Sequence, residues 1–320
     1  MEYFGTLGPS CAEENTLRKM IQAGMTGLRI NLSHGGLNSR REWIRAAQAA
    51  AREEGITLKL LIDLEGPELR IGQLPEILEL KEGEEICLQS LGVPALVLEK
   101  LETGDEILLD DGKLLLSASR EGYGKVVRGG LLKSRKSLAV SGKTFQLPTL
   151  TEHDLGNLAL AEELGITGVM LPFVRGKEDL ICLREALAAA GCPSVRIYAK
   201  IENLAGVAHL DELIQESDEI VIARGDLGNS MPLWKLPAVQ KAISAACLEK
   251  GRDFMVVTQM LDSMHTRAVP TRAEVMDIFQ AVLDGASSVM LTGETAGGKY
   301  PVEAMTYLVR TGREGEKARR

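Results

Sequence analysis

The chain has 320 residues, of which 45% are hydrophobic and 26% are charged, and its formal net charge is −8 at pH 7. This length exceeds the usual size of one compact domain and supplies enough apolar residues for a large core. The acidic balance argues against nonspecific nucleic-acid binding, which needs a basic surface. No run approaches 18 apolar residues, and the first residues lack a basic segment followed by an apolar one. We therefore expect no membrane span and no signal peptide.

The five cysteines, Cys11, Cys87, Cys182, Cys192 and Cys247, are odd in number and form no Cys-x-x-Cys pair. Disulfides persist mainly in oxidising compartments, whereas thiols of cytosolic proteins stay reduced. The cysteine pattern therefore predicts free thiols and a cytoplasmic protein.

A strand-then-helix rhythm covers most of the chain. Short apolar, β-branched runs that end in polar residues are predicted strands, and amphipathic helical patterns separate them. Eight strands are predicted, at residues 3–7, 27–31, 58–63, 168–173, 195–201, 219–223, 254–258 and 288–292. Eight β/α units favour a closed (β/α)8 TIM barrel of the α/β class. A doubly wound open sheet stays as the alternative, because local patterns do not show closure.

The clearest helical signals lie at residues 14–23, 38–54, 151–164 and 271–284. In the first of these segments, Leu17, Met20 and Ile21 share one face. Asn38 and Thr151 are the predicted N-caps of the second and third helices, since Asn and Thr side chains accept hydrogen bonds from the first free amides.

Residues 72–147 break this rhythm. They contain no long helical pattern, and Gly, Asp and Pro separate short apolar runs at residues 85–88, 95–98, 106–109 and 113–117. These runs predict a small all-β domain inserted after the third strand, with the barrel formed by residues 1–71 and 148–320. The insertion point is at the C-terminal face of the barrel, where such enzymes place their active sites. We therefore expect the small domain to act as a lid that excludes water.

Charged residues lie at or just after the ends of five of the eight predicted strands. They are the cations Arg29, Lys200 and Arg224 and the carboxylates Asp63, Glu202, Asp226 and Glu294. Mg²⁺ binds a few carboxylate oxygens and keeps places for water and substrate, and Arg and Lys neutralise phosphate or carboxylate groups. Each charge alone could belong to a structural ion pair. The whole set predicts metal-assisted chemistry on an anionic small molecule.

The chain also resembles the pyruvate kinase family over nearly its whole length. The matching stretches, in order, are GTLGPS, GLRINLSHG, LIDLEGPELRIG, SRKS, LPTLTEHDL, AKIENLAGV, IARGDLG, VTQMLDSM, PTRAEV and VMLTGETAGGKYPVEA. The resemblance implies transfer of the phosphoryl group of phosphoenolpyruvate to ADP, which gives pyruvate and ATP in glycolysis. It also implies Mg²⁺ (or Mn²⁺) and K⁺ as cofactors.

For the reacting groups, the resemblance assigns the divalent metal to Glu202 and Asp226. Lys200 and Arg29 would contact the transferring phosphoryl group, and Thr292, where the family has Ser, would help to deliver a proton to the enolate. The substrate carboxylate would be held by the backbone amides around Arg224, Gly225 and Asp226 and by the hydroxyl group of Thr258, which also counts among the catalytic residues.

For the monovalent cation, the resemblance assigns four ligands, which are Asn31, Ser33, Asp63 and the carbonyl group of Leu64. A glutamate at the position of Glu68 accompanies K⁺ dependence in the family. The nucleotide would be contacted by Arg70, Lys136 and Asn31.

Several positions depart from the family pattern. Leu64 and Glu65 replace the usual Thr-Lys, Pro172 replaces Ser, and Ala139 stands where a lid Asn is common. The family's further C-terminal domain is also missing, so we expect no sugar-phosphate allostery and no C-terminal tetramer interface. A homodimer through barrel helices stays open.

Two alternative functions remain at this point. One is a metal-dependent lyase or aldolase that acts through a pyruvate enolate on the same barrel. The other is a non-catalytic homologue that binds a metabolite. A non-catalytic homologue is expected to have lost Lys200, Glu202 or Asp226. All three residues are present in this chain.

Overall fold

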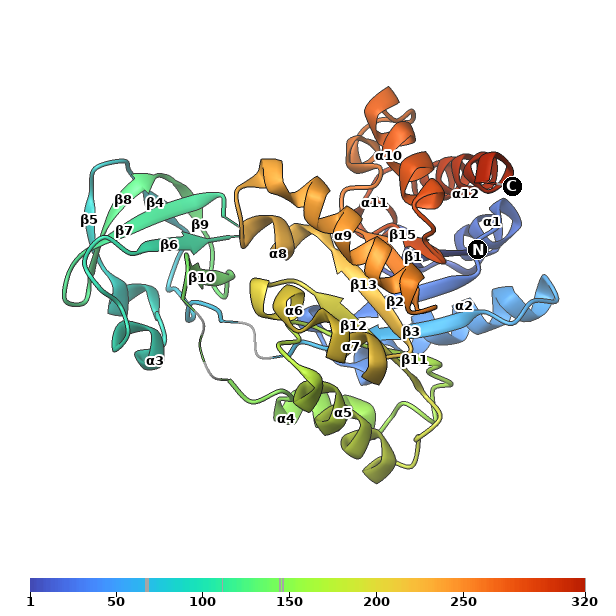
Figure 1. Cartoon of the computed structure of the whole chain (residues 1–320), viewed down its shortest axis with the longest axis horizontal. Helices are drawn as coiled ribbons and strands as arrows, with labels where there is room; N and C mark the ends of the chain where they lie inside the picture. The colour runs from blue at the N-terminus through green and yellow to red at the C-terminus, as the bar shows by residue number, and fades with distance from the viewer. Residues whose placement is uncertain (67–68, 111, 144, 146, 320) are drawn as a thin grey trace. The chain divides into compact units, whose positions relative to one another are not determined.

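The computed structural model describes residues 1–66, 69–110, 112–143, 145 and 147–319. These residues form two compact units (Figure 1), of which the larger comprises Met1–Gly66 with Thr149–Arg320 and the smaller comprises Pro67–Pro148. The observed division lies a few residues from the one expected from the sequence, which placed the insertion at residues 72–147.

The larger unit is a closed barrel of eight parallel strands, as predicted. The order around the barrel is β1-β15-β14-β13-β12-β11-β3-β2, so strands that follow one another in the chain are neighbours. Closure comes from the pairing of the first strand with the last. The strands are β1 (Glu2–Thr6), β2 (Gly27–Asn31), β3 (Lys59–Asp63), β11 (Gly168–Leu171), β12 (Arg196–Ile201), β13 (Glu219–Ala223), β14 (Asp253–Val257) and β15 (Ser288–Met290).

Helices connect the barrel strands. They are α1 (Glu14–Ala23), η1 (Leu32–His34), η2 (Leu37–Arg40), α2 (Arg41–Glu53), α4 (Glu152–Leu158), α5 (Lys177–Ala189), α6 (Leu204–Ala208), α7 (Leu210–Glu216), α8 (Arg224–Asn229), η4 (Leu233–Lys235), α9 (Leu236–Glu249), η5 (Asp262–His265), α10 (Arg272–Leu283), α11 (Gly293–Ala296) and α12 (Pro301–Arg319). None of the helices in the described ranges is long and apolar enough to cross a membrane.

Two predictions about single helix residues are confirmed and one is wrong, and the helix predicted at residues 151–164 ends earlier, at Leu158. In α1, Leu17, Met20 and Ile21 are buried as expected. Thr151 caps α4 by accepting a hydrogen bond from the amide of Asp154. Asn38 is not a cap, because it lies within the 3₁₀ turn η2, and its Oδ1 accepts a hydrogen bond from Nε of Arg41 instead. A side chain that reaches the next turn in this way leaves the start of α2 without a side-chain cap.

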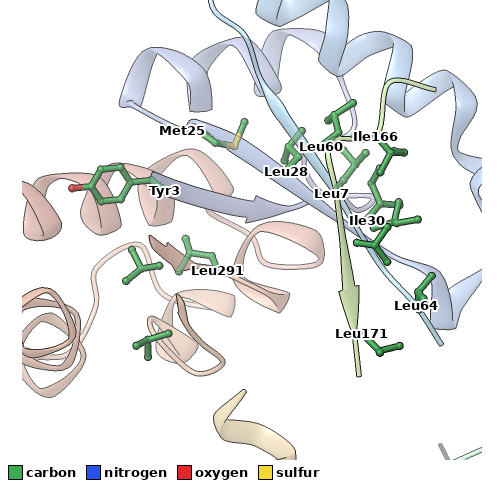
Figure 2. Close-up of a cluster of buried hydrophobic side chains, with 14 of the residues drawn as sticks. Tyr3, Leu7, Met25, Leu28, Ile30, Leu60, Leu64, Ile166, Leu171 and Leu291 are labelled. Carbon is green, nitrogen blue, oxygen red and sulfur yellow. The ribbon is translucent and has the colours of Figure 1, made fainter. Parts of the chain in front are cut away.

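The barrel strands bury alternate residues on opposite faces. Along β13, Ile220 and Ile222 belong to the large core between strands and helices, whereas Val221 and Ala223 belong to a separate small cluster. Because side chains alternate along a strand, the small cluster fills the barrel interior. Figure 2 shows part of the large core, in which Leu28, Ile30 and Leu60 project from β2 and β3. The barrel is thus packed with side chains on both faces of its wall.

The smaller unit contains antiparallel strands around its own core. Its elements are β4 (Leu78–Leu80), β5 (Glu85–Cys87), η3 (Leu88–Leu91), α3 (Ala95–Leu98), β6 (Glu106–Leu109), β7 (Leu114–Arg120), β8 (Tyr123–Arg128), β9 (Gly130–Leu132) and β10 (Leu138–Val140). The expected strand at residues 95–98 is wrong, because this segment forms the single helical turn α3. Ala and Leu favour helix, and Pro94 precedes the turn at a position that needs no amide donor.

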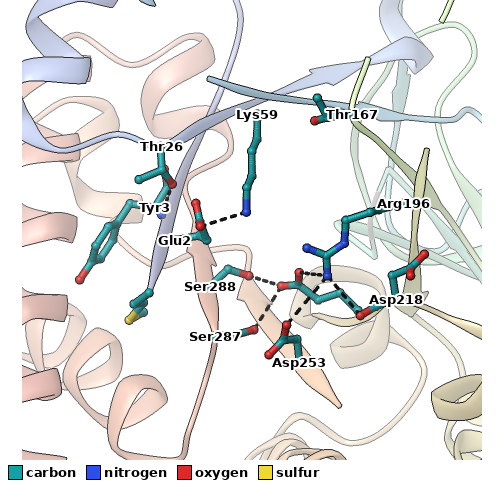
Figure 3. Close-up of polar contacts among 12 residues, drawn as sticks. Glu2, Tyr3, Thr26, Lys59, Thr167, Arg196, Asp218, Asp253, Ser287 and Ser288 are labelled. Atoms are coloured by element: carbon teal, nitrogen blue, oxygen red, sulfur yellow. Dashed lines mark hydrogen bonds and ion pairs between the residues drawn. The ribbon is translucent and has the colours of Figure 1, made fainter. Parts of the chain in front are cut away.

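A polar network covers the amino-terminal ends of the barrel strands (Figure 3). Glu219, at the start of β13, is 4% exposed and accepts hydrogen bonds from the hydroxyl groups of Ser287 and Ser288. Nη2 of Arg196 lies 3.8 Å from Oε2 of Glu219 and 3.9 Å from Oδ2 of Asp253. Burial raises the pKa of Glu219 to about 7, although the hydrogen bond from Ser288 and the charge of Arg196 oppose this rise.

This network predicts a pH-dependent stability. The pKa of Glu219 rises from its ordinary value of 4.5 to about 7 in the folded state, so folding binds a proton between these values. Each pKa unit corresponds to about 1.4 kcal/mol, so ionisation of Glu219 costs ~3 kcal/mol of folding free energy as pH rises through this window. The substitution Glu219→Gln removes this titration. Urea unfolding should show the variant gaining stability relative to the parent from pH 5 to pH 8.

Glu2→Gln is the matched control at the same end of the barrel. Burial alone would raise the pKa of Glu2, but hydrogen bonds from Thr26 and Lys59 outweigh it and lower that pKa. The stability that Glu2 contributes is therefore present at neutral pH and is lost as pH falls, which is the opposite sign. A stability difference between Glu219→Gln and the parent that stays constant with pH would contradict the prediction.

Candidate active site

Four charged side chains form a continuous chain of ion pairs at the carboxyl ends of β2, β3 and β12. Nε and Nη2 of Arg29 donate to Oδ2 of Asp63 at 2.8 and 2.6 Å. Nζ of Lys200 lies 3.1 Å from Oδ1 of Asp63 and 2.8 Å from Oε1 of Glu202. Both carboxylates are buried, and only 12% of each cationic side chain is exposed. The predicted cluster of opposite charges therefore forms at the strand ends, with Asp63 at its centre.

Burial and neighbouring charges set the ionisation of this cluster. Burial alone would raise the pKa of Asp63, but Lys200 and Arg29 outweigh it, and the pKa is lowered. Burial would likewise lower the pKa of Lys200, but Asp63 and Glu202 raise it. Burial raises the pKa of Glu202 to about 7, and the charges of Asp226 and Asp63 act in the same direction, whereas Lys200 opposes them. Lys200 is therefore a fixed cation at neutral pH.

The two carboxylates expected to bind a divalent metal are Glu202, after β12, and Asp226, in α8 after β13. The charge of Asp226 contributes to the raised pKa of Glu202. Within the described ranges, no group of three or more His, Cys, Asp or Glu side chains is arranged to hold a metal. Two carboxylates nevertheless fit Mg²⁺, which commonly takes one or two carboxylates together with water and substrate oxygens.

The side chain of Arg224 does not join the chain of ion pairs that the other two strand-end cations, Arg29 and Lys200, form with carboxylates. Its Nη1 lies 2.7 Å from Oδ2 of Asp277 in α10, and its Nη2 donates to the carbonyl group of Thr258 at 2.7 Å. Arg224 therefore ties the end of β14 to the start of α8. The guanidinium group of Arg224 is therefore occupied by protein groups.

Glu294 also differs from the expectation, which grouped it with the inward carboxylates. Its Oε1 accepts a hydrogen bond from the amide of Leu261 at 3.0 Å. Its Oε2 accepts from the amide and hydroxyl groups of Thr292 at 2.8 and 3.2 Å. Glu294 is 1% exposed, so it holds together the loops after β14 and β15 and orients the Thr292 hydroxyl group.

Three residues that follow barrel strands adopt a left-handed backbone, which no local pattern in the sequence predicted. They are Phe173 with φ of 53°, Thr258 with 76° and Gln259 with 55°. This conformation is unfavourable for residues other than Gly and persists where surrounding contacts fix it. The amide of Phe173 donates to Oε2 of Glu202 at 2.8 Å, and Arg224 binds the carbonyl group of Thr258. These partners are distant in sequence, so no local signal could have revealed the strain.

The expected K⁺ ligands lie on two adjacent strands and the turns that follow them. Asn31 and Asp63 are paired in the register of β2 and β3. Oδ1 of Asn31 accepts from the amide of Ser33 at 3.1 Å, and the amide of Leu64 donates to the carbonyl group of Met170 at 3.2 Å. Glu68, the residue expected to mark K⁺ dependence, lies outside the described residues.

The two expected nucleotide-binding cations, Arg70 and Lys136, lie in the smaller unit. Arg70 and Ser137 form an antiparallel bridge, which places both cations on adjacent segments. Nη1 of Arg70 donates to the carbonyl group of Arg135 at 2.9 Å, and Nζ of Lys136 lies 2.6 Å from Oδ1 of Asp110. The structure therefore brings these two predicted residues together within that unit.

The fold and the site define a (β/α)8-barrel protein with a buried site of mixed charge at the carboxyl ends of its strands. A family model described as pyruvate kinase, barrel domain, matches residues 2–305, and the chain belongs to the pyruvate kinase family.

Curated relatives agree with this assignment. The chain is 36% identical to the pyruvate kinase of Geobacillus stearothermophilus over 320 residues, which cover 95% of this chain and 54% of that protein. Against the pyruvate kinase of Aeropyrum pernix the identity is 37% over 314 residues, which cover 95% and 68% of the two proteins. For that of Clostridium perfringens it is 35% over 329 residues, covering 97% and 69%. The chain thus spans from about half to about two-thirds of the length of these relatives.

Helix α8 offers a test of the packing beside Thr258. A Cβ atom at Gly225 would lie 3.2 Å from Cγ2 of Thr258, which is a tight contact, whereas a Cβ atom at Gly228 would meet Leu233 and Leu236 at 3.5 Å. Replacing Gly by Ala in a helix stabilises by about 0.5–1 kcal/mol when the space is free. Urea unfolding should therefore show stabilisation by Gly228→Ala and little or none by Gly225→Ala. Equal stabilisation by both substitutions would contradict this account of the close approach.

Proposed function

We propose that this chain transfers the phosphoryl group of phosphoenolpyruvate to ADP, with Mg²⁺ (or Mn²⁺) and K⁺ as cofactors. The observation that carries the proposal is the buried chain of ion pairs from Arg29 through Asp63 and Lys200 to Glu202. Phosphoryl transfer requires positioning and neutralisation of oxygen charge more than covalent help from the protein. Two fixed cations beside a metal-binding pair of carboxylates meet this requirement.

Lys200 and Arg29 would bind the oxygens of the transferring phosphoryl group. Both cations are already oriented by Asp63, so little reorganisation is needed when substrate binds. The divalent metal, when held by Glu202 and Asp226, would neutralise further charge on the substrate oxygens. On binding, a cation would exchange a carboxylate partner for a substrate oxygen, and a carboxylate would exchange a cation partner for the metal. Each charged group would therefore keep a partner of opposite charge.

The substrate carboxylate would be held by the amides of Gly225 and Asp226 and by the hydroxyl group of Thr258. Gly225 allows this arrangement, since a side chain there would press on Thr258. The Thr292 hydroxyl group, oriented by Glu294, would help to deliver a proton to the enolate that the transfer leaves. Protonation of the enolate gives pyruvate and makes the transfer favourable.

The remaining assignments are part of the same proposal. K⁺ would bind Asn31, Ser33, Asp63 and the carbonyl group of Leu64, and ADP would contact Arg70, Lys136 and Asn31. We propose small-molecule partners only, with no nucleic acid or membrane partner, and a cytoplasmic location. A homodimer through barrel helices and the absence of sugar-phosphate control stay predictions.

The first test compares Lys200→Met with the parent in an assay of pyruvate formation from phosphoenolpyruvate and ADP with Mg²⁺ and K⁺. Loss of the cation beside the phosphoryl group should reduce kcat by a factor of about 10³ or more. Lys59→Met is the matched control, because Lys59 forms an ion pair with Glu2 at the opposite end of the barrel. Its activity should stay near that of the parent.

Either of two results would contradict the proposal. One is equal activity in Lys200→Met and the parent, with folding verified by circular dichroism. The other is absence of pyruvate formation by folded parent protein that binds phosphoenolpyruvate and Mg²⁺. Pyruvate released from a different substrate without ADP would instead support a lyase or an aldolase.

The second test concerns the monovalent cation. Replacing K⁺ by tetramethylammonium at constant ionic strength should lower pyruvate formation at least tenfold, because the cation offsets negative charge brought by the substrates. The variant Ser33→Ala should need a higher K⁺ concentration for half-maximal activity. Full activity without K⁺ would remove the monovalent cation from the proposed mechanism.

A further inference from the structure

Asp154, in α4, is a buried carboxylate that none of the assignments above uses. Its side chain is 0% exposed. Oδ2 accepts from the amide and hydroxyl groups of Thr151, both at 2.9 Å, which completes the cap of its own helix. The same carboxylate also accepts from the amides of Glu65 and Gly66, at 2.9 and 3.2 Å. A helix cap requires only the first two of these hydrogen bonds, so the other two need a separate explanation.

The extra hydrogen bonds join two segments that are far apart in the sequence. Glu65 and Gly66 are the last residues of the larger unit before the insertion, and Thr151 follows shortly after the chain returns to it. One carboxylate therefore fixes both connections on the barrel side. Nδ1 of His153 also lies 3.1 Å from Oε2 of Glu65, which adds a second contact between the same segments.

Gly66 is further restricted by its surroundings. Its φ is +61°, and a Cβ atom there would lie 2.5 Å from Cγ of Pro172, at the end of β11. The backbone of Gly66 thus passes close to Pro172, one of the positions where the sequence departs from the family pattern. The close approach and the hydrogen bond to Asp154 together hold this residue against the barrel.

The segment from Asp63 to Gly66 is consequently fixed at every residue. Asp63 is held by Arg29 and Lys200, Leu64 by the carbonyl group of Met170, and the next two residues by Asp154. The end of β3 and the residues after it are therefore anchored to the barrel up to Gly66, the last residue before the smaller unit.

We propose that Asp154 is a positioning residue that keeps Asp63 and the carbonyl group of Leu64 in the geometry needed to bind a monovalent cation. It does so by holding the amides of Glu65 and Gly66, which directly follow these two groups in the chain. The inference rests on the proposed function, since that function assigns the cation to Asp63 and Leu64. It adds a residue that touches neither the cation nor the substrates.

The test compares Asp154→Asn with Thr151→Ala. Asn keeps the size of the side chain and can still cap the helix, but it replaces one acceptor oxygen by an NH₂ donor that cannot bind an amide. Thr151→Ala weakens the same helix cap and leaves the carboxylate free to hold Glu65 and Gly66. Two quantities are measured in the full chain. The first is the rate of hydrogen exchange of these two amides. The second is the K⁺ midpoint, which is the K⁺ concentration that gives half of the rise in Tm caused by K⁺, with tetramethylammonium as the reference cation.

We expect at least tenfold faster exchange of the Glu65 amide, whose acceptor Oδ1 becomes the NH₂ group, in Asp154→Asn and a severalfold higher K⁺ midpoint, with both quantities near parent values in Thr151→Ala. Unchanged hydrogen exchange in Asp154→Asn would contradict the role of Asp154 in holding Glu65 and Gly66. Faster exchange with an unchanged K⁺ midpoint, or the same midpoint shift in both variants, would overturn the positioning role. A parent protein that binds K⁺ but forms no pyruvate would refute the proposed function alone, because neither readout depends on catalysis.

Discussion

The ionised carboxylate of Asp63 is the group on which the arrangement of the site depends. It lies at the end of a barrel strand, is buried, and faces two cations from the strands β2 and β12. Taking three charges out of water is costly unless they neutralise one another. The cluster is therefore stable only as a set, and the removal of one member leaves its neighbours as uncompensated buried charges. This mutual dependence fixes Arg29 and Lys200 in orientation before any ligand arrives.

A second group of interactions holds the strand ends in backbone conformations that would otherwise be unfavourable. Arg224 and Glu294 each connect loops from different strands, and each uses a charged side chain to bind backbone groups. Charge-assisted hydrogen bonds of this kind are shorter and stronger than neutral ones. The charges at the rim of the barrel therefore divide into two sets, one that forms ion pairs among its own members and one that binds backbone groups of the loops.

The sequence predicted the barrel because each strand is a short apolar run followed by a polar residue, and eight such units favour closure. It also placed Arg29, Lys200 and Glu202 at one end of the barrel, since they lie near the ends of their strands or just after them. It could not show that Arg224 turns toward α10, because its partner Asp277 is distant in sequence. Local patterning likewise failed at residues 95–98, where a run of four apolar residues fits a strand or a helical turn equally well.

The packed interior of the barrel limits the routes by which a small molecule could reach the carboxyl ends of the strands. Phe4, Tyr198 and Met255 belong to the cluster that fills the space enclosed by the barrel strands. The polar network around Glu219 covers the amino-terminal ends of these strands. Because the described side chains fill the barrel interior, any molecule that binds at the carboxyl ends of the strands would have to enter and leave from that end.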